Sequence, residues 1–440
     1  MSLTTKLVEY IRQKPIEHHD LEMAGLFVLD AVANLVGGRS SDAAGPILNW
    51  AMSSAASNPI DAGRQALVMG GLIHSLETDD LHRTSVTHPG CVVVPVALSL
   101  GAQRQIDGHQ LLTSVLHGFE AMCRIGDSVG NEHYRVWHNT GTCGTFGAAM
   151  TAASILSLNA DQSVDALGNA GTQSAGLWEF LSSGAMSKHL HAGRAAESGI
   201  IAAEWAAHGF SGPSEILEGE KGLYAGACPD ANPLAVMATP DADWQLLKTS
   251  IKPWPSCRHT HPAVDGALAL SAQVSADDIA EIAVDTYQAA INVCDRPDPR
   301  TEYQAKFSLQ HCVVAALIDG RLDFDSFSEQ RRAQLGDLRA KVRLNLADPY
   351  ASAYPDQYWG SGVTVRLRNG ESLGQSRQSC AGDPEDPLDR DQMTVKARML
   401  FDHGGMPAAD AEALIDAIFG LAEGRADWSV IQTAFPPAIL

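Results

Sequence analysis

Residues 192–207 read AGRAAESGIIAAEWAA, and this stretch is the strongest indication of how most of the chain folds. A helix that is small or apolar on every side packs inside a protein, so we expect it in the centre of a helical bundle. Apolar residues at three- and four-residue spacing indicate further helices around it. They occur in Leu21–Val36, Asp61–Leu76, Gly108–Val129 and Gly144–Leu156.

The pattern changes after Trp244. Alternating apolar and polar residues predict strands at the start of Ile279–Val293 and in 342–346 and 363–367, and Asn369-Gly370 predicts a hairpin turn before Leu373. A predicted helix, Ala305–Ile318, lies between the first strand and the later pair. This part of the chain is therefore expected to be α+β.

The acidic, proline-containing segment 382–391 (GDPEDPLDRD) is typical of a connector, and helical spacing returns after it. We therefore predict a mainly α protein. Residues 1–245 and 394–440 would form one large all-helical domain, and residues 246–393 a smaller α+β domain inserted into it.

The composition narrows the class of partner. The formal net charge is −21, which argues against binding nucleic acid or an anionic membrane surface. We see no signal-peptide core and no apolar run of about 20 residues. Eight scattered cysteines suggest free thiols in a reducing compartment, so we expect a cytoplasmic protein.

The segment 74–90, HSLETDDLHRTSVTHPG, is the first that could carry chemistry. It concentrates acids and imidazoles on a loop between apolar helices. A carboxylate beside an imidazole fixes the tautomer of the ring and raises its basicity, which suits acid–base catalysis. A solvated polar loop is the alternative, and we favour the functional interpretation. The candidates are Glu77, Asp80 and His88.

The segment 137–146, WHNTGTCGTF, places His138 before a glycine-rich helix start. Free N–H groups at such a start favour a substrate carboxylate. The sequence leaves equally open that His138 only caps the helix.

The segment 187–194, SKHLHAGR, would place Lys188 and His191 on one helix face. Because a lysine is rarely buried without a partner, its partner is either a bound anion or a protein carboxylate. His189 and His191 could bind a metal, but no spacing supplies a third ligand, and we predict no metal.

The segment 251–262, IKPWPSCRHTHP, holds Lys252 and Arg258 beside stiffening prolines. Arginine suits bidentate binding of a carboxylate, whereas a rigid linker with solvated charges explains the same pattern. Cys257 is more simply a small buried residue than a nucleophile.

No phosphate-binding loop, dinucleotide fingerprint, serine-hydrolase elbow or His-Glu-x-x-His motif is present in the sequence. Nucleotide, nicotinamide, serine-hydrolase and zinc-protease chemistry therefore lose support, and we predict no cofactor.

These four segments, with a fifth at 305–320 (AKFSLQHCVVAALIDG), resemble the MmgE/PrpD family over about residues 10–420. That family includes 2-methylcitrate dehydratase, cis-aconitate decarboxylase and iminodisuccinate epimerase. The resemblance implies that the α+β domain is a lid, that the protein is a homodimer and that the site lies between the domains.

The resemblance also implies which positions form the site. Carried over one by one, the family's polar site residues fall on Glu77, Asp80, His88, His138, Lys188 and Lys252. Cys257 stands where cis-aconitate decarboxylase has a histidine, which argues against that activity, and Glu77 stands where an aspartate is often found.

We therefore predict a cofactor-independent, dehydratase-like lyase acting on a small di- or tricarboxylate. His88 and His138 would be the acid–base pair, with Asp80 orienting one imidazole and Lys188 neutralising charge. Substrate binding would fall to Glu77, His191, Lys252, Cys257 and Arg258. An epimerase ranks second and a decarboxylase third; a non-catalytic binder and a metal-dependent hydrolase are further alternatives.

Overall fold

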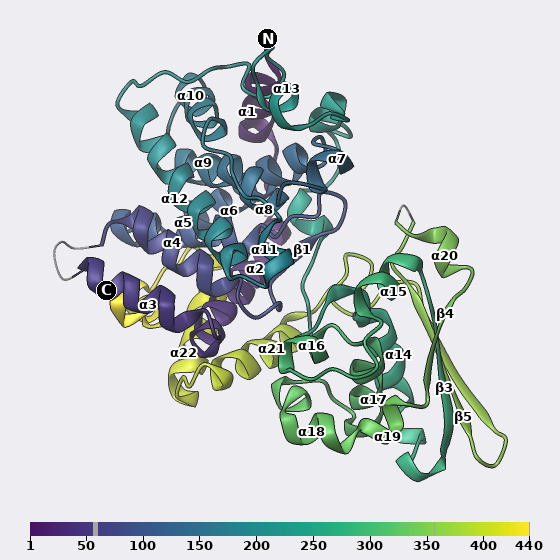
Figure 1. Ribbon diagram of the computed structural model, residues 1–440. Coiled ribbons are helices and arrows are strands. Elements are labelled where there is room, and N and C mark those ends of the chain that lie inside the picture. Colours follow the sequence, from purple (N-terminus) through teal and green to yellow (C-terminus); the bar gives the residue numbers. More distant parts are fainter. Residues whose placement is uncertain (56–59, 356, 440) are drawn as a thin grey trace. The chain divides into compact units, whose positions relative to one another are not determined.

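The chain divides into two parts that each hold their own contacts. The computed structural model describes residues 1–55, 60–355 and 357–439. A helical unit comprises Met1–Ile251 with Asp389–Leu440, and an α+β unit comprises Lys252–Leu388 (Figure 1). The predicted mainly α class is confirmed.

The helical unit contains the segments predicted as helices near both ends of the chain. α2, α4, α6 and α9 cover the four segments singled out in the sequence, and α21 and α22 follow the acidic connector. The helices are α1 (Leu3–Gln13), α2 (His18–Gly37), α3 (Ala44–Ala55), α4 (Ala62–Ile73), α5 (Gly90–Arg104), α6 (Gly108–Gly126), α7 (Asn131–Tyr134), α8 (Asn139–Thr142), α9 (Gly144–Ile155), α10 (Ala160–Gly171), α11 (Phe180–Ser183), α12 (Ser187–Ala207), α13 (Leu223–Ala227), α21 (Arg390–His403), α22 (Ala408–Phe419) and α23 (Trp428–Ile431).

The small-residue stretch forms most of α12, which packs against α4, α5, α9 and α10. Glycines permit a very close approach to α4. A Cβ atom added to Gly193 would lie 2.2 Å from the backbone oxygen of Leu67, and one added to Gly70 would lie 3.0 Å from Cα of Gly193. The expectation that this helix is enclosed on all sides is only partly correct, because Leu190 and Trp205 on its remaining face are 57% and 54% exposed.

Helix α2 is more apolar than we expected from the sequence, in which we saw no apolar run long enough to cross a membrane. Together with the 3₁₀ turn that follows, residues His18–Ser40 are long and apolar enough to cross a membrane by length and composition alone, with a mean hydropathy of 1.5 over the best window. However, 83% of that window is buried inside the protein. The helix packs against α4, α6, α21 and α22, so it belongs to the core of the helical unit.

A two-residue ladder makes the helical unit not quite all-helical. β1 (Leu81–His82) pairs antiparallel with β2 (Thr249–Ser250). This pairing holds the chain to the helical unit up to Ile251, beyond our predicted boundary at 245. At the other boundary, Asp389 caps α21 through the N–H of Gln392, so the helical unit resumes before residue 394.

The α+β unit is a four-stranded sheet with helices. The strand order is β4-β3-β5-β6, with β3 and β4 parallel and the other pairs antiparallel. The predicted strands and hairpin are confirmed, and Gly370 at the turn has a φ of 91°. The elements are β3 (Ile279–Thr286), β4 (Val342–Leu346), β5 (Ser361–Leu367), β6 (Ser372–Arg377), α14 (His261–Leu270), α15 (Gln288–Cys294), α16 (Glu302–Lys306), α17 (Leu309–Asp319), α18 (Glu329–Gln334), α19 (Gly336–Arg339) and α20 (Tyr350–Ala353).

The predicted helix Ala305–Ile318 is wrong at its start. α16 ends at Lys306, and α17 begins at Leu309. The side chain of Ser308 accepts a hydrogen bond from the backbone N–H of His311, and such capping begins a new helix in place of continuing the old one.

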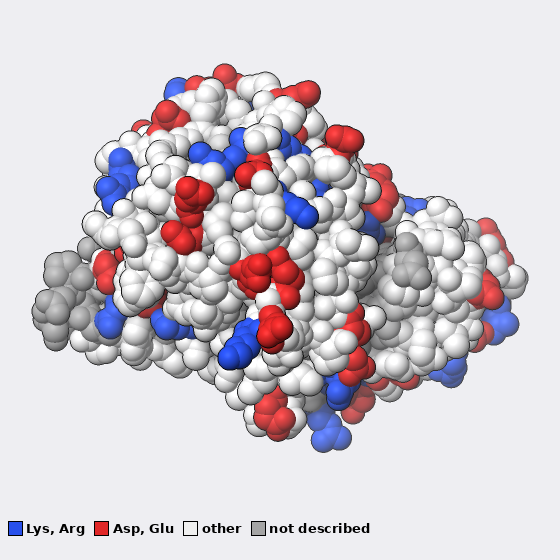
Figure 2. Space-filling view, turned by 90° about the horizontal axis from the view of Figure 1, so that it is seen from above, with Lys and Arg blue, Asp and Glu red and all other residues white. Residues whose placement is uncertain are grey.

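Charged side chains are dispersed over the face drawn in Figure 2. Acidic and basic groups are interspersed there and are separated by wide uncharged areas. The net charge of −21 is therefore not gathered into one patch on that face.

Candidate active site

The loop between α4 and α5 carries the largest set of buried polar side chains that the sequence had pointed to. Glu77 and Val86 both have positive φ angles, 63° and 48°. This conformation is unfavourable for residues other than glycine, most of all for a β-branched valine. Such strain costs about 1–3 kcal/mol per residue and persists where surrounding contacts hold the backbone, often at functional sites.

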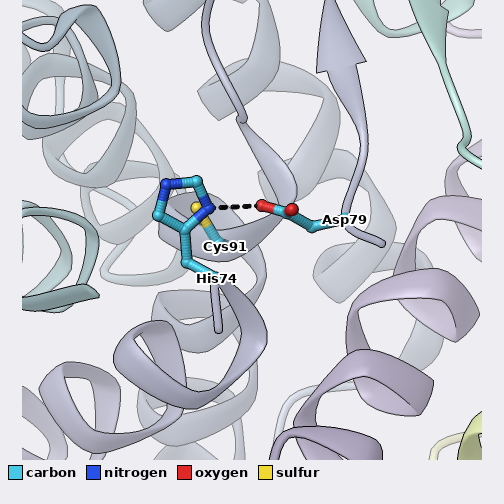
Figure 3. Close-up of side chains that lie close together, drawn as sticks. All are labelled: His74, Asp79 and Cys91. Carbon is cyan, nitrogen blue, oxygen red and sulfur yellow. Dashed lines mark hydrogen bonds and ion pairs between the residues drawn. The ribbon is translucent and has the colours of Figure 1, made fainter. Parts of the chain in front are cut away.

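One carboxylate oxygen in this loop faces two imidazoles. Oδ2 of Asp79 lies 2.6 Å from Nδ1 of His74 (Figure 3) and 3.4 Å from Nδ1 of His88. The two rings meet edge to face, with centroids 4.8 Å apart. Asp79 is fully buried, so its charge acts on both rings without screening by water.

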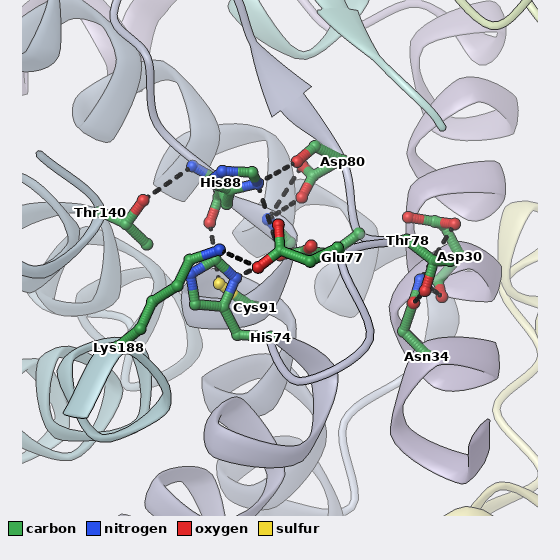
Figure 4. Close-up of polar contacts among 12 residues, drawn as sticks. Asp30, Asn34, His74, Glu77, Thr78, Asp80, His88, Cys91, Thr140 and Lys188 are labelled. Atoms are coloured by element: carbon green, nitrogen blue, oxygen red, sulfur yellow. Dashed lines mark hydrogen bonds and ion pairs between the residues drawn. The ribbon is translucent and has the colours of Figure 1, made fainter. Parts of the chain in front are cut away.

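The contacts of His88 determine which ring nitrogen carries hydrogen. Nδ1 lies 2.6 Å from the backbone oxygen of Asp80, and a carbonyl oxygen only accepts hydrogen bonds. Nδ1 is therefore the protonated nitrogen, and the lone pair of the neutral ring is on Nε2. The backbone N–H of His88 donates to Oγ1 of Thr140 (Figure 4).

Asp80 holds the start of α5 to this loop. Both of its carboxylate oxygens lie 3.0 Å from the backbone nitrogen of Gly90. A Cβ atom on Gly90 would come within 2.8 Å of Oδ1 of Asp80, so only glycine allows this approach. Asp80 thus supports His88 through its backbone carbonyl while its side chain anchors the helix.

His138 is brought to the same place from the N-terminus of α8. Its ring stacks on that of His74 at 5.6 Å, with an angle of 14° between the planes. Its Nδ1 lies 3.3 Å from Nδ1 of His191. The ring does not cap the helix, so the capping alternative for His138 was wrong. Burial, and next the nearby His74 and Lys188, hold the pKa of His138 well below its usual range, and the ring is neutral at pH 7.

Lys188 donates a hydrogen bond to Oε1 of Glu77 (Figure 4). The sequence left open whether a bound anion or a protein carboxylate would partner this lysine, and Glu77 is a protein partner. Both side chains are largely buried, at 15% and 12% exposure. The first turn of α12 thereby reaches the strained residue of the loop.

A cavity of about 590 Å³ opens beside His191 in the helical unit. Its wall is mostly apolar and includes Trp137, Leu177, Phe180 and Leu190, and Arg194 also lines it. Because His191 contacts His138, this cavity adjoins the histidine cluster.

Two of the predicted substrate-binding residues have protein partners in the α+β unit. Nη2 of Arg258 donates to Oδ2 of Asp383 at 2.5 Å, so the solvated-linker alternative for this arginine is wrong. Nε and Nη1 of Arg258 are buried without a hydrogen-bond partner among the described residues. Cys257 donates its backbone N–H to Lys306 and lies beside Cys294. Lys252 is buried as well.

The structure also adds residues to which we assigned no role in the site from the sequence. His74 is the C-cap residue directly after α4, Asp79 precedes Asp80, and Cys91 lies in the first turn of α5. The ring of Trp178 packs on that of His138, with the ring centroids 4.6 Å apart. The sequence offered one signal, the adjacent pair Asp79-Asp80, but it could not indicate which carboxylate faces the imidazoles.

Burial has the largest effect on the pKa values of His74 and Cys91. It lowers the pKa of His74, although Asp79 acts in the opposite direction. It raises the pKa of the Cys91 thiol well above its usual range, and Asp79 and Asp80 add to this shift. Nε2 of His74 has no hydrogen-bond partner in the described parts of the chain.

Comparison with known proteins agrees with this arrangement of motifs. The MmgE/PrpD N-terminal domain matches residues 5–234, and the MmgE/PrpD C-terminal domain matches residues 254–419. Cis-aconitate decarboxylase of Homo sapiens is 27% identical over 352 residues, which cover 76% of this chain and 71% of that protein. The Aspergillus terreus enzyme of the same name is 23% identical over 363 residues, covering 76% and 74%.

A mitochondrial 2-methylcitrate dehydratase of Yarrowia lipolytica is 26% identical over 133 residues, which cover 28% of this chain and 26% of that protein. These relatives are enzymes named for small carboxylate substrates. Because the two domain models together span most of the sequence, the chain belongs to the MmgE/PrpD family.

Proposed function

We propose that this protein is a cofactor-independent lyase that acts on a small di- or tricarboxylate at the carbon next to a carboxylate. The observation that carries the proposal is the buried cluster in which Asp79 faces two imidazoles and Lys188 enters from α12. It combines a base of fixed tautomer with a cation in a site of low dielectric constant, where both act strongly.

His88 is the base in this proposal. Its Nδ1–H is held by the carbonyl of Asp80, so Nε2 takes the proton from the substrate carbon. Asp79 stabilises the imidazolium that forms, because an opposite charge nearby favours the protonated ring. Asp80, which we expected to orient one imidazole, does so in this proposal through its backbone carbonyl.

Lys188 and His138 act on the negative charge that develops on the substrate. As the carbon loses its proton, negative charge spreads onto the neighbouring carboxylate, and the Lys188 ammonium stabilises it. The ring N–H of His138 donates a hydrogen bond to the leaving hydroxyl group and passes its proton to that group as the C–O bond breaks, and the proton that His88 took from carbon then restores the neutral ring of His138. The C–O bond breaks, water leaves, and a C=C bond remains.

Decarboxylation is the second candidate, because two of the relatives reported above are named for it. There the C–C bond to a carboxylate breaks, CO₂ leaves with no proton taken from carbon, and a protonated group supplies the proton that the carbanion needs. Epimerisation, our alternative from the sequence, would use His88 and a second group on opposite faces of the carbon.

Incubating the purified protein with di- and tricarboxylates in D₂O and recording NMR spectra separates the three. Dehydration yields alkene signals, and decarboxylation yields labelled bicarbonate from a ¹³C-carboxylate. Solvent deuterium at the α-carbon without loss of water or CO₂ indicates epimerisation. Binding without any of these changes would support the non-catalytic alternative and would contradict the proposal.

The site assignment is tested with the acid that is turned over. His88→Ala and Lys188→Ala should each lower kcat by about 100-fold or more, while His208→Ala, at an exposed position, should not. Near-normal turnover in both site variants would require this assignment to be abandoned.

Lys252→Ala tests the substrate-binding role predicted for the α+β unit and should raise KM. Light scattering tests the predicted homodimer.

A further inference from the structure

Three potential metal ligands of different chemistry meet in the histidine cluster. One ligand atom each from His74, Asp79 and Cys91 lies within 4.8 Å of the other two. They come from the end of α4, the strained loop and the first turn of α5, and the side chains converge on one point (Figure 3). All three are buried.

The donor set matches the preferences of a borderline-soft divalent cation. Imidazole nitrogen, thiolate sulfur and carboxylate oxygen are the three protein ligands of Zn²⁺, and three such ligands leave a fourth position open. Thiolate and carboxylate together carry two negative charges, which neutralise a divalent ion. The carboxylate of Glu77 offsets the nearby Lys188 ammonium.

Binding would need only local changes. In a tetrahedral site with bonds of about 2.0–2.3 Å, the donor atoms lie roughly 3.3–3.8 Å apart. Nδ1 of His74 and Oδ2 of Asp79, at 2.6 Å, are closer because they share a hydrogen. Side-chain shifts of about 1 Å would therefore open the place for an ion.

A bound cation would displace two protons, one from the thiol of Cys91 and one from Nδ1 of His74. The thiol of Cys91 donates to the backbone oxygen of His88 at 3.1 Å, and it would release its proton to solvent. For Nδ1 of His74 to bind the ion, its hydrogen moves to Nε2. That atom has no partner among the residues described, so the change of tautomer breaks no other hydrogen bond.

We propose that His74, Asp79 and Cys91 bind a thiophilic divalent cation such as Zn²⁺, and that the bound ion inhibits the enzyme. This differs from our expectation of no metal. Inhibition follows because the ion takes the carboxylate of Asp79, which supports His88. That second clause rests on the proposed function, whereas metal binding does not.

Co²⁺ is the spectroscopic probe. Protein treated with a chelator and then desalted is titrated with Co²⁺ alone. The expected result is one equivalent bound with a sulfur-to-cobalt charge-transfer band, which Zn²⁺ then removes. Cys91→Ser should lose the band and bind Co²⁺ at least about tenfold more weakly. The matched control, Cys143→Ser, removes another buried thiol and should keep the band.

A second measurement does not depend on the variants folding. X-ray absorption of the wild-type protein loaded with Zn²⁺ should show one sulfur with nitrogen and oxygen neighbours. A shell without sulfur, a band that survives Cys91→Ser, or a band lost equally in Cys143→Ser would each overturn the proposal.

The inhibition is measured on whichever polycarboxylate is turned over. Zn²⁺ should lower the rate of the wild type, and Cys91→Ser should need at least about tenfold more Zn²⁺ for half inhibition. If no acid is turned over, the proposed function fails while the cobalt titration still decides the metal site. If Co²⁺ binds through Cys91 and Zn²⁺ leaves turnover unchanged, the inhibitory role is wrong.

Discussion

Nδ1 of His74 lies 2.6 Å from Oδ2 of Asp79, a hydrogen bond between two residues that are both removed from solvent. Because the same oxygen lies 3.4 Å from Nδ1 of His88, Asp79 acts on the proposed base as well. The carboxylate that faces both imidazoles is therefore that of Asp79, the neighbour of the predicted site residue Asp80.

Asp79→Asn removes this charge while keeping the shape of the side chain. We expect kcat to fall by about 100-fold or more. Without the carboxylate the imidazolium that forms on His88 is less stabilised, so kcat/KM should fall as well. Asp161→Asn, an exposed position in α10, is the control. A kcat for Asp79→Asn equal to that of Asp161→Asn would show that the carboxylate does not act on the base.

The fold could be predicted where local pattern and final position agree. Helix α12 is rich in small residues and packs against four other helices, and the strands of the α+β unit alternate as half-buried strands do. The prediction failed where the structure depends on contacts between distant segments or on a single side chain. Nothing local in Leu81–His82 or Thr249–Ser250 marks two short segments 168 residues apart as partners, and the break at Ser308 depends on one side-chain cap.

The candidate site, like the fold, could be predicted only in part. His88, His138 and Lys188 belong to distinctive segments and meet in one cluster of the helical unit, whereas Asp79 and Cys91 depend on how the loop turns. The positive φ angles of Glu77 and Val86 set which side chains face inward, and no residue-type pattern predicts those angles for a glutamate and a valine.

Helix α21 carries two ion pairs that allow a matched comparison of stability. Lys396 donates to Asp30 of α2 and, at 2.7 Å, to the backbone oxygen of Thr78 in the site loop. Lys396→Met removes the cation beside the buried carboxylate of Asp30, which should lower the free energy of unfolding by about 3–5 kcal/mol. Because the loop loses a contact, kcat should fall too. Urea unfolding and steady-state kinetics check both.

The comparison variant is Arg398→Met. Arg398 makes a two-bond contact with Glu412, at 2.6 and 2.7 Å, but both side chains are about half exposed. Solvent and salt screen such a pair, so we expect little change in stability. Equal losses in the two variants would contradict the role given to burial.

The close approach of α12 and α4 predicts intolerance of a single methyl group. Gly193→Ala would place Cβ 2.2 Å from the backbone oxygen of Leu67, and the helices would have to separate. We expect a loss of about 1–3 kcal/mol. Gly226→Ala in α13, where an added Cβ meets no atom within 4 Å, should be stabilising by about 0.4–1 kcal/mol. Thermal and urea unfolding measure both, and a neutral Gly193→Ala would show that this contact is not tight.

Stability should fall as the pH is lowered from about 6.5 towards 4, because the fold buries neutral histidines. Burial lowers the pKa of His117 to about 4, and the same cause, with His74 and Lys188, lowers the pKa of His189 to about 4. Between pH 4 and the ordinary histidine value of about 6.5, the unfolded chain binds protons that the folded chain does not. Each such histidine therefore stabilises the fold above pH 6.5, and this contribution is lost as the pH falls, at about 1.4 kcal/mol per pH unit.

His117→Gln isolates one of these contributions away from the candidate site. The ring of His117 lies 3.1 Å from Oγ of Ser154 and stacks near Trp244, so the variant should lose some stability at pH 7. Its free energy of unfolding should nevertheless depend less steeply on pH between 6.5 and 4, by about one proton. His19→Gln, at an exposed position, should keep the slope of the wild type. Urea unfolding at half-unit steps of pH measures the difference, and parallel curves for wild type and His117→Gln would contradict a neutral buried His117.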